Sequence, residues 1–240
     1  MLFLTDHDTV SGFPEASDEA RGSSMKVYCG IEINTRQSDQ VHVLGYGLRW
    51  QDEALALRLS DFRERRAQRI HRIVENLRRH GIDISFEEVQ GVSKEALGRP
   101  HVADALVRRK IVQSRQEAFN RFLSRGQPGY SQSVGPTPEE AISLIREMGG
   151  FASLAHPQTV KDLSGLKSLV ERGLEGLEVY YGAHSPADIK RYGDIAGHHG
   201  LIATGGSDFH GPQSGRETSF GVDVPDEVFD RFMERLSRCN

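Results

Sequence analysis

Six short apolar runs along the chain each end in a polar cluster, a pattern typical of buried strands. We expect strands at residues 2–5, 26–33, 41–46, 151–155, 176–181 and 201–204. Helix signals separate the later runs. Residues 137–140 (Thr-Pro-Glu-Glu) combine an N-cap, a proline and a capping-box glutamate, Ser185 begins a second helix, and residues 165–172 form a third. Strands that alternate with helices predict a parallel sheet or barrel.

Residues 51–130 break this alternation because they contain helical patterns only. One long helix is expected over residues 53–80 and should end at Gly81, and capping-box patterns at Ser85 and Ser114 begin shorter helices. We therefore expect three parts along the chain: a first barrel part at residues 1–50, an all-helical insertion at 51–130 and a second barrel part at 131–240.

The insertion and the rest of the chain differ in charge. Residues 51–130 contain 16 Lys and Arg against 11 Asp and Glu, a net charge of +5, whereas the remaining residues contain 14 against 23, a net charge of −9. An acidic body with a basic insertion suits an enzyme that holds cations with its carboxylates and attracts an anionic substrate. The alternative is that these arginines form solvated helix faces without a partner.

The composition is that of an ordinary globular protein, with 37% hydrophobic and 27% charged residues and a pI of about 6.2. No run approaches the roughly 18 apolar residues of a membrane-spanning helix, and the N-terminus lacks the basic region of a signal peptide. Cys29 and Cys239 lie far apart in the sequence and suggest no disulfide framework. We expect a cytoplasmic protein with no membrane association and no stable protein partner.

Histidine, aspartate and glutamate gather at the ends of the predicted strands. They occur in Asp6-His7-Asp8, at Glu32, at His42, in His156-Pro157, at Glu178 and in Ser207-Asp208-Phe209-His210. In barrels the reactive face lies at the carboxyl ends of the strands, where imidazoles and carboxylates can bind Zn, Mn or Fe. A single histidine at a strand end is usually structural, but histidines at four strands with a glutamate between them predict a metal site.

Seven segments that span nearly the whole chain have a further meaning when taken in order. They are residues 4–12 (LTDHDTVSG), 30–33 (GIEI), 42–46 (HVLGY), 98–103 (GRPHVA), 154–157 (LAHP), 176–180 (GLEVY) and 206–211 (GSDFHG). Together they resemble the motifs of the polymerase and histidinol phosphatase (PHP) family of metal-dependent phosphoesterases. The resemblance implies an α/β fold, a distorted (β/α)7 barrel of the PHP type with a helical insertion. It points to a bacterial branch whose members remove phosphate from nucleoside 3′,5′-bisphosphates, open cyclic ones, or trim RNA from its 5′ end.

The resemblance also implies a set of metal ligands and catalytic residues. Two or three divalent ions, of Mn, Zn or Fe, would be bound by His7, Glu32, His42, His156, Asp208 and His210. Glu32 resembles the carboxylate that bridges two of the metals. Glu32, Asp208 and His210 are accordingly the expected catalytic residues, whereas Asp6 is expected to orient its neighbours.

Three further residues are expected to bind substrate. Arg99 and His101 resemble a phosphate clamp, since a guanidinium fork binds two phosphate oxygens at once; the alternative is that Arg99 faces water where Pro100 opens a helix. His184 precedes a helix N-terminus and is expected to contact a substrate phosphate. The expected substrate is a phosphorylated small molecule or a short oligonucleotide, and the reaction is hydrolysis by a metal-activated water.

The sequence departs from the family pattern at its start. Family members begin with a strand carrying His-x-His and a following aspartate, whereas this sequence resembles them only from the second motif onward. We therefore expect the first βα unit to be missing, with a start codon assigned too late as the favoured explanation, and fewer bound metals than a complete site holds. Two alternatives stay open: a non-catalytic or weakly active remnant, and a metal-dependent amidohydrolase, since similar His/Asp barrels cleave amides.

Overall fold

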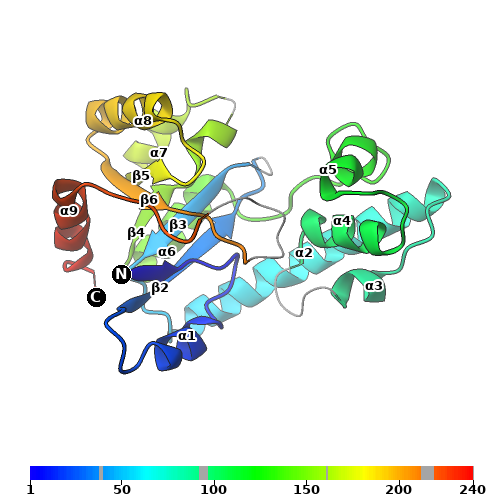
Figure 1. Ribbon diagram of the computed structural model, residues 1–240, viewed down its shortest axis with the longest axis horizontal. Helices are drawn as coiled ribbons and strands as arrows, with labels where there is room; N and C mark the ends of the chain where they lie inside the picture. Colours follow the sequence, from blue (N-terminus) through cyan, green and yellow to red (C-terminus); the bar gives the residue numbers. More distant parts are fainter. Residues whose placement is uncertain (38–39, 92–96, 161, 212–218, 240) are drawn as a thin grey trace. The chain divides into compact units, whose positions relative to one another are not determined.

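The computed structural model describes residues 1–37, 40–91, 97–160, 162–211 and 219–239 of the chain. The chain folds into two compact units (Figure 1). The first unit contains Met1–Leu55 and Pro136–Asn240, and the second contains Ala56–Gly135. All strands that the structure describes belong to the first unit, and the described elements of the second unit are helices.

The first unit is built on one six-stranded sheet whose strand order follows the chain, from β1 to β6. The strands are β1 (Leu2–Leu4), β2 (Val27–Asn34), β3 (His42–Tyr46), β4 (Phe151–Leu154), β5 (Leu174–Tyr181) and β6 (Ile202–Gly206). All six predicted strands are therefore confirmed, with ends that differ by a residue or two. The fold is the expected mixed α/β class.

One strand runs against the others, which corrects the expectation of a parallel sheet. β3 pairs antiparallel with both β2 and β4, whereas the β1–β2, β4–β5 and β5–β6 pairs are parallel. The connection from Asn34 to His42 explains this direction, because so short a segment can reverse the chain but cannot form the crossover that a parallel neighbour needs. The amino end of β3 thus lies beside the carboxyl ends of β2 and β4, and it places His42 there.

Helices cover both faces of the sheet in the first unit. They are α1 (Phe13–Glu19), α6 (Pro138–Glu147), the 3-10 turn η2 (Pro157–Thr159), α7 (Leu166–Glu171), α8 (Pro186–His199) and α9 (Asp226–Leu236). On one face, Gly45 of β3 leaves room for Ile145 of α6. On the other face, Phe232 of α9 packs against Tyr46 and Phe3. Side chains alternate along a strand, so the neighbours Gly45 and Tyr46 face opposite helices.

Helices α1 and α9 were not among the predicted elements. Each has a proline at its start: Pro14 lies in the first turn of α1, and Pro225 precedes α9. The acidic pair Asp226 and Glu227 in the first turn of α9 is a second helix-start signal that the apolar pattern alone does not reveal.

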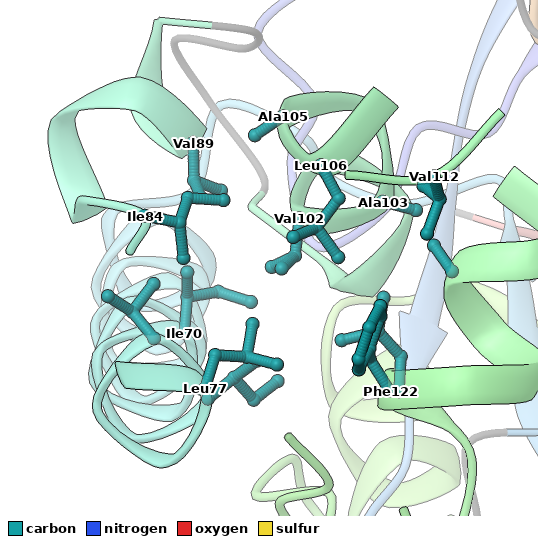
Figure 2. Close-up of a cluster of buried hydrophobic side chains, with 14 of the residues drawn as sticks. Ile70, Leu77, Ile84, Val89, Val102, Ala103, Ala105, Leu106, Val112 and Phe122 are labelled. Carbon is teal, nitrogen blue, oxygen red and sulfur yellow. The ribbon is translucent and has the colours of Figure 1, made fainter. Parts of the chain in front are cut away.

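The second unit contains most of one long helix and several short ones. They are α2 (Glu53–Arg79), α3 (Phe86–Gln90), α4 (Arg99–Arg108), α5 (Arg115–Ala118) and the π-helical turn η1 (Phe119–Leu123). Gly81 adopts a φ of +77° just after α2 and ends that helix as predicted. Figure 2 shows the core, in which Ile70 and Leu77 of α2 lie with Leu106 of α4 and Phe122 of η1. None of the described helices is both long and apolar enough to cross a bilayer.

The predicted capping boxes form at two of three positions. The side chains of Ser85 and Thr137 each accept a hydrogen bond from the backbone N–H three residues on. The glutamate side chain at that position accepts one from the backbone N–H of the N-cap residue. At Ser114 the prediction was wrong. The Ser114 side chain accepts from the Glu117 N–H, but the Glu117 carboxylate accepts from the N–H of Gln113, one residue before the N-cap.

Candidate metal centre

Histidines and carboxylates from several strand ends form one cluster, made up of His7, Asp8, Glu32, His42, His156, Asp208 and His210. Glu32, on β2, lies at its centre. The residue is buried, with 5% of its surface exposed. Its Oε1 lies 2.6 Å from His42 Nδ1 and 3.1 Å from His156 Nε2. Its Oε2 lies 3.6 Å from His7 Nδ1. A buried carboxylate is costly unless donors or cations surround it, and three imidazoles surround this one.

A short parallel bridge beyond the end of β1 places His7 beside Glu32. The Glu32 N–H donates to the Asp6 carbonyl at 3.1 Å, and the Asp8 N–H donates to the Glu32 carbonyl at 3.0 Å. Asn34 lies two residues after Glu32 and therefore on the same face of β2. Its side-chain amide donates to Asp8 Oδ2 at 3.1 Å and lies 3.0 Å from His7 Nδ1, which orients the imidazole.

His42 begins β3 and His156 follows β4, so the reversed direction of β3 brings the two rings together. His42 Nδ1 and His156 Nε2 lie 3.1 Å apart. His156 Nδ1 lies 3.0 Å from Thr159 Oγ1, which fixes the ring so that Nε2 faces Glu32. Two imidazole nitrogens and a carboxylate oxygen that meet at one point are a donor set suited to Zn, Mn or Fe.

Asp208 and His210 follow β6 and reach the same end of the sheet. The Tyr181 hydroxyl donates to Asp208 Oδ2 at 3.0 Å. His210 Nδ1 lies 2.8 Å from the Asp208 carbonyl oxygen and 3.2 Å from its Oδ1. The rings of His210 and His7 lie 5.7 Å apart between their centroids. Residues from β6 and from the segment after β1 therefore meet at this cluster.

Backbone strain gathers at the same place. Among the described non-glycine residues, positive φ angles occur at Asp8 (52°), His156 (27°), Asp208 (52°) and Lys110 (58°). Three of these four residues belong to the cluster. Such conformations cost about 1–3 kcal/mol each and concentrate at functional sites, where the surrounding structure holds them.

The charges of the cluster shift pKa values in opposite directions. Burial alone would raise the pKa of Glu32, but the charges of His7 and His42 and hydrogen bonds from His156 and His42 hold it well below its usual range. Burial opposes protonation of His156, yet its hydrogen bond to Glu32 and the carboxylates nearby raise its pKa to about 9. Burial raises the pKa of Glu178 to about 8. A divalent cation bound here would replace the protons that the imidazoles and carboxylates otherwise hold.

The donor set fits a divalent ion. His7, Glu32 and His42 offer one ligand atom each, and these atoms all lie within 4.8 Å of one another. Mixed nitrogen and oxygen donors suit Zn, Mn and Fe alike, so the arrangement selects a class of metal and not one element.

A cavity of about 780 Å³ opens at the cluster. Residues of both β1 and β6 line it, so the sheet curves until its two outermost strands face one space. The cluster residues that line the cavity are His7, Glu32, His156, Asp208 and His210. Its volume falls in the range of roughly 300–1,000 Å³ that is usual for small-molecule sites.

His184 lies just before α8, and its ring already has protein partners. Its Nδ1 lies 2.8 Å from the Val179 carbonyl oxygen, and its Nε2 lies 2.7 Å from the Gln158 side-chain oxygen. The ring also stacks on Tyr192, with centroids 4.9 Å apart. A phosphate can bind His184 only in place of one of these partners.

Arg99 and His101 lie in the first turn of α4 in the second unit. The Arg99 guanidinium donates to the Leu123 carbonyl at 3.4 Å and lies over the Phe119 ring at 5.3 Å. His101 Nδ1 accepts the Gly98 N–H at 2.9 Å and so completes the cap of α4. Burial lowers the pKa of His101. Phosphate binding by these two residues stays a prediction.

Three residues that contact the cluster had no predicted role: Asn34, Glu178 and Tyr181. Asn34 follows Glu32 by two positions, and this spacing on a strand is a signal that could have placed it on the same face. Tyr181 ends β5, beside the strand that precedes Asp208. Glu178 stood out as a strand-end carboxylate, but its contact with the chain after β4 depends on which strands are neighbours.

The chain is similar to curated bacterial enzymes, although no family model matches it. It is 32% identical over 237 residues to a 3′,5′-nucleoside bisphosphate phosphatase from Chromobacterium violaceum, a match that covers 94% of this chain and 82% of the relative. It is also 32% identical over 220 residues to the 5′-3′ exoribonuclease Rnm of Escherichia coli, covering 88% of this chain and 75% of the relative.

Solved structures agree with these relatives. A structure from Bifidobacterium adolescentis, assigned as a metal-dependent phosphoesterase, is 29% identical with a TM-score of 0.84 and covers 99% of this chain and 85% of that one. A structure from Chromobacterium violaceum described as an amidohydrolase, with bound sulfate and no metal, is 30% identical with a TM-score of 0.82 and covers 96% and 86%. The extent of these matches and the geometry of the cluster show that the chain belongs to the PHP family of metal-dependent phosphoesterases, enzymes that hydrolyse phosphate esters.

Proposed function

We propose that this enzyme hydrolyses nucleoside 3′,5′-bisphosphates or the 5′ ends of short RNA, with divalent metals bound at the Glu32 cluster. The observation that supports the proposal most strongly is the meeting of Glu32 with three imidazoles, those of His7, His42 and His156, at one end of the sheet. Such a concentration of buried nitrogen and oxygen donors has a chemical use as a metal site and little use as a core.

The proposed ligands share one end of the sheet and come from five separate segments: His7, Glu32, His42, His156, Asp208 and His210. Glu32 is the proposed bridging ligand because its two oxygens face different imidazoles. Glu32, His42 and His156 would complete one site, and His7 with His210 would contribute to another. Two or three ions, of Mn, Zn or Fe, are proposed for the complete centre.

The protein itself would hold the ligands in place. A divalent metal at such a site supplies an activated water and neutralises charge on the phosphoryl oxygens. Three of the proposed ligands are each fixed by a further side chain: His156 by Thr159, His7 by Asn34 and Asp208 by Tyr181. Supports of this kind preserve ligand geometry while substrate enters.

Asp208 and His210 are the proposed catalytic partners of Glu32. Both line the cavity, and His210 is the more exposed of the two. As a metal ligand, His210 would act through the ion that it holds, which would stabilise charge on the phosphate oxygens as the ester bond breaks. Asp208 Oδ1 and the Asp208 carbonyl oxygen both lie near His210 Nδ1 and hold the ring in place.

The nucleotide substrate class has three supports. One relative is a nucleoside bisphosphate phosphatase and another is an exoribonuclease, and the structure from Chromobacterium violaceum binds sulfate, a tetrahedral oxyanion like phosphate. Phe209 and Phe220, 42% and 57% exposed, line the cavity with ring centroids 5.5 Å apart. Stacking of a base on an aromatic ring contributes about 1–3 kcal/mol, which suits a nucleoside beside the scissile phosphate.

Substrate contacts from Arg99, His101 and His184 complete the proposal. The net charge of +5 over residues 51–130 would attract an anionic substrate. Arg99 is the proposed clamp on a second, non-scissile phosphate, because its guanidinium can bind two oxygens at once. His184 would join only after the substrate displaces Gln158.

A metal-dependent amidohydrolase is the second candidate, because one solved neighbour is described as an amidohydrolase. The two functions can be compared by supplying the protein with Mn²⁺ and four substrates: adenosine 3′,5′-bisphosphate, a 5′-phosphorylated oligoribonucleotide, p-nitrophenyl phosphate and an N-acetyl amino acid. We expect phosphate or nucleotide release, with kcat/KM for a nucleotide substrate at least about tenfold above that for p-nitrophenyl phosphate.

Each remaining outcome has a definite meaning. Release of acetate from the N-acetyl amino acid, with no phosphate ester cleaved, would establish the second candidate. Equal kcat/KM values for nucleotides and p-nitrophenyl phosphate would refute the nucleotide substrate class while leaving the phosphoesterase reaction. A protein that binds Mn²⁺ and cleaves none of the four would be the non-catalytic remnant.

A further inference from the structure

β5 provides none of the proposed metal ligands, although it lies between the two strands that precede His156 and Asp208. Its residue Glu178 is buried, with 5% of its surface exposed, and it lines the cavity. The next residue, Val179, lies against Gly193 of α8 on the other face of the sheet. A carboxylate buried this deeply needs hydrogen-bond partners, and one of its oxygens accepts a backbone N–H.

One oxygen of Glu178 contacts the backbone of a proposed metal ligand. Glu178 Oε2 accepts the His156 N–H at 2.6 Å. His156 has a φ of 27°, a conformation that costs a non-glycine residue about 1–3 kcal/mol unless its surroundings hold it. The short hydrogen bond to Glu178 is such a restraint, and it acts on the peptide that sets the direction of the His156 ring towards Glu32.

The other oxygen of Glu178 lies against the end of β6. A Cβ on Gly206 would lie 3.2 Å from Glu178 Oε1, so the glycine leaves room for the carboxylate. Two residues earlier, the hydroxyls of Ser153 and Thr204 meet at 2.9 Å across Gly176, where a Cβ would lie 2.7 Å from Ser153 Cβ. The inner face of β5 is thus shaped so that Glu178 reaches the ends of both neighbouring strands.

We propose that Glu178 is a positioning residue that sets the metal affinity of the cluster by holding the His156 peptide so that His156 Nε2 faces Glu32. The inference rests on the proposed metal centre, but it concerns metal binding and not hydrolysis. A side chain that served the core alone would change the stability of the fold. A positioning residue changes metal affinity, and it does so through His156.

The test compares two substitutions of Glu178 by titrating the metal-free protein with Mn²⁺ in a calorimeter. Glu178→Gln keeps an oxygen that can accept the His156 N–H, and its affinity should stay within about threefold of the wild type. Glu178→Leu has no acceptor and should bind Mn²⁺ about 10–100-fold more weakly, the usual effect of losing a residue that orients a ligand. Ser153→Ala is the matched control, because it removes a buried hydroxyl of the neighbouring strand whose hydrogen-bond partner is Thr204. It should shift the urea midpoint and leave the Mn²⁺ affinity unchanged.

A double-mutant cycle completes the test. His156→Ala keeps the group of His7, Glu32 and His42, and in this background the effect of Glu178→Leu should shrink to about twofold or less. Three results would overturn the role. They are equal losses of Mn²⁺ affinity in Glu178→Gln and Glu178→Leu, an unchanged affinity in Glu178→Leu, and a full loss that persists in the His156→Ala background. If Glu178→Leu does not fold, the folded Glu178→Gln variant alone decides: a loss of Mn²⁺ affinity above about tenfold would overturn the positioning role. A wild-type protein that binds no Mn²⁺ would refute the metal centre as well.

Discussion

Glu32 faces three of the proposed histidine ligands, since its two oxygens lie near His42, His156 and His7. Glu32→Ala should therefore be the most damaging single change. We expect more than about 100-fold weaker Mn²⁺ binding, which exceeds the roughly 10–100-fold loss typical of residues that only orient a ligand. Calorimetric titration of the metal-free variant measures this. Glu15→Ala, a change at an exposed glutamate of α1, is the control, and an affinity loss no larger than that of Thr159→Ala would contradict the bridging role.

The Cys29 thiol should be unreactive in the folded protein. Burial, with a smaller effect from the charge of Asp6, raises the pKa of Cys29 to about 12. At pH 8 a thiol with this pKa is thiolate in about one molecule in ten thousand, and the thiolate is the reactive form. Iodoacetamide should leave Cys29 unmodified in the native protein and modify it in urea, as mass spectrometry can measure. Rapid modification of the native protein at Cys29 would mean that this thiol is neither buried nor inert.

The candidate ligands were easier to predict than the residues that hold them. His7, His156 and Asp208 end apolar runs, and rare polar residues at strand ends are visible in a sequence. Glu178 acts through a backbone N–H 22 residues away, so its partner becomes evident only once strand neighbours are known. His184, the proposed substrate contact, looked available in the sequence, but its ring nitrogens face Val179 and Gln158 in the fold.

At the scale of elements, apolar runs and helix caps were reliable because they depend on neighbouring residues. All six strands and the helices beginning after Ser85, Thr137 and Ser185 were confirmed. The direction of β3 was not predicted, since it depends on the length of the loop before His42 and on which strand lies beside it. The reversal nevertheless places His42 at the end of the sheet where the other candidate ligands lie.

Gly45 tests the packing of α6 on the sheet. A Cβ at this position would lie 2.9 Å from both Ile145 Cγ1 and Ile31 Cγ2, atoms of buried branched side chains. Gly45→Ala should therefore lower the free energy of unfolding by about 1–3 kcal/mol through overpacking, measured by urea denaturation. Gly197→Ala is the matched control, because Gly197 lies in α8 with nothing within 4 Å of a new Cβ. That change should raise stability by about 0.5–1 kcal/mol; equal effects of the two would contradict this packing.

At the scale of the whole molecule, the basic second unit should serve substrate binding. Arg99→Ala should raise KM for adenosine 3′,5′-bisphosphate about tenfold to a hundredfold, because a charge-assisted phosphate contact contributes about 1.5–3 kcal/mol. KM for p-nitrophenyl phosphate should change much less if Arg99 binds a second phosphate. Steady-state kinetics on both substrates measure this.

Arg125→Ala is the control for Arg99, because it removes the same charge from an exposed position of the same unit. Equal KM increases for both substrates in Arg99→Ala would place Arg99 at the reacting phosphate. An effect no larger than that of Arg125→Ala would mean that Arg99 serves only contacts within its own unit, such as those with Leu123 and Phe119. The nucleotide substrate class would then rest on the cavity and the relatives alone.

The most direct test of the account joins metal content to hydrolysis in one sample. The protein is freed of metal with a chelator, Mn²⁺ is added in steps, and bound metal and phosphate released from adenosine 3′,5′-bisphosphate are measured together. The account predicts no release from the metal-free protein and a rate that rises in proportion to bound metal until the cluster is full. Undiminished release without metal, or a fully loaded protein that releases no phosphate, would contradict it.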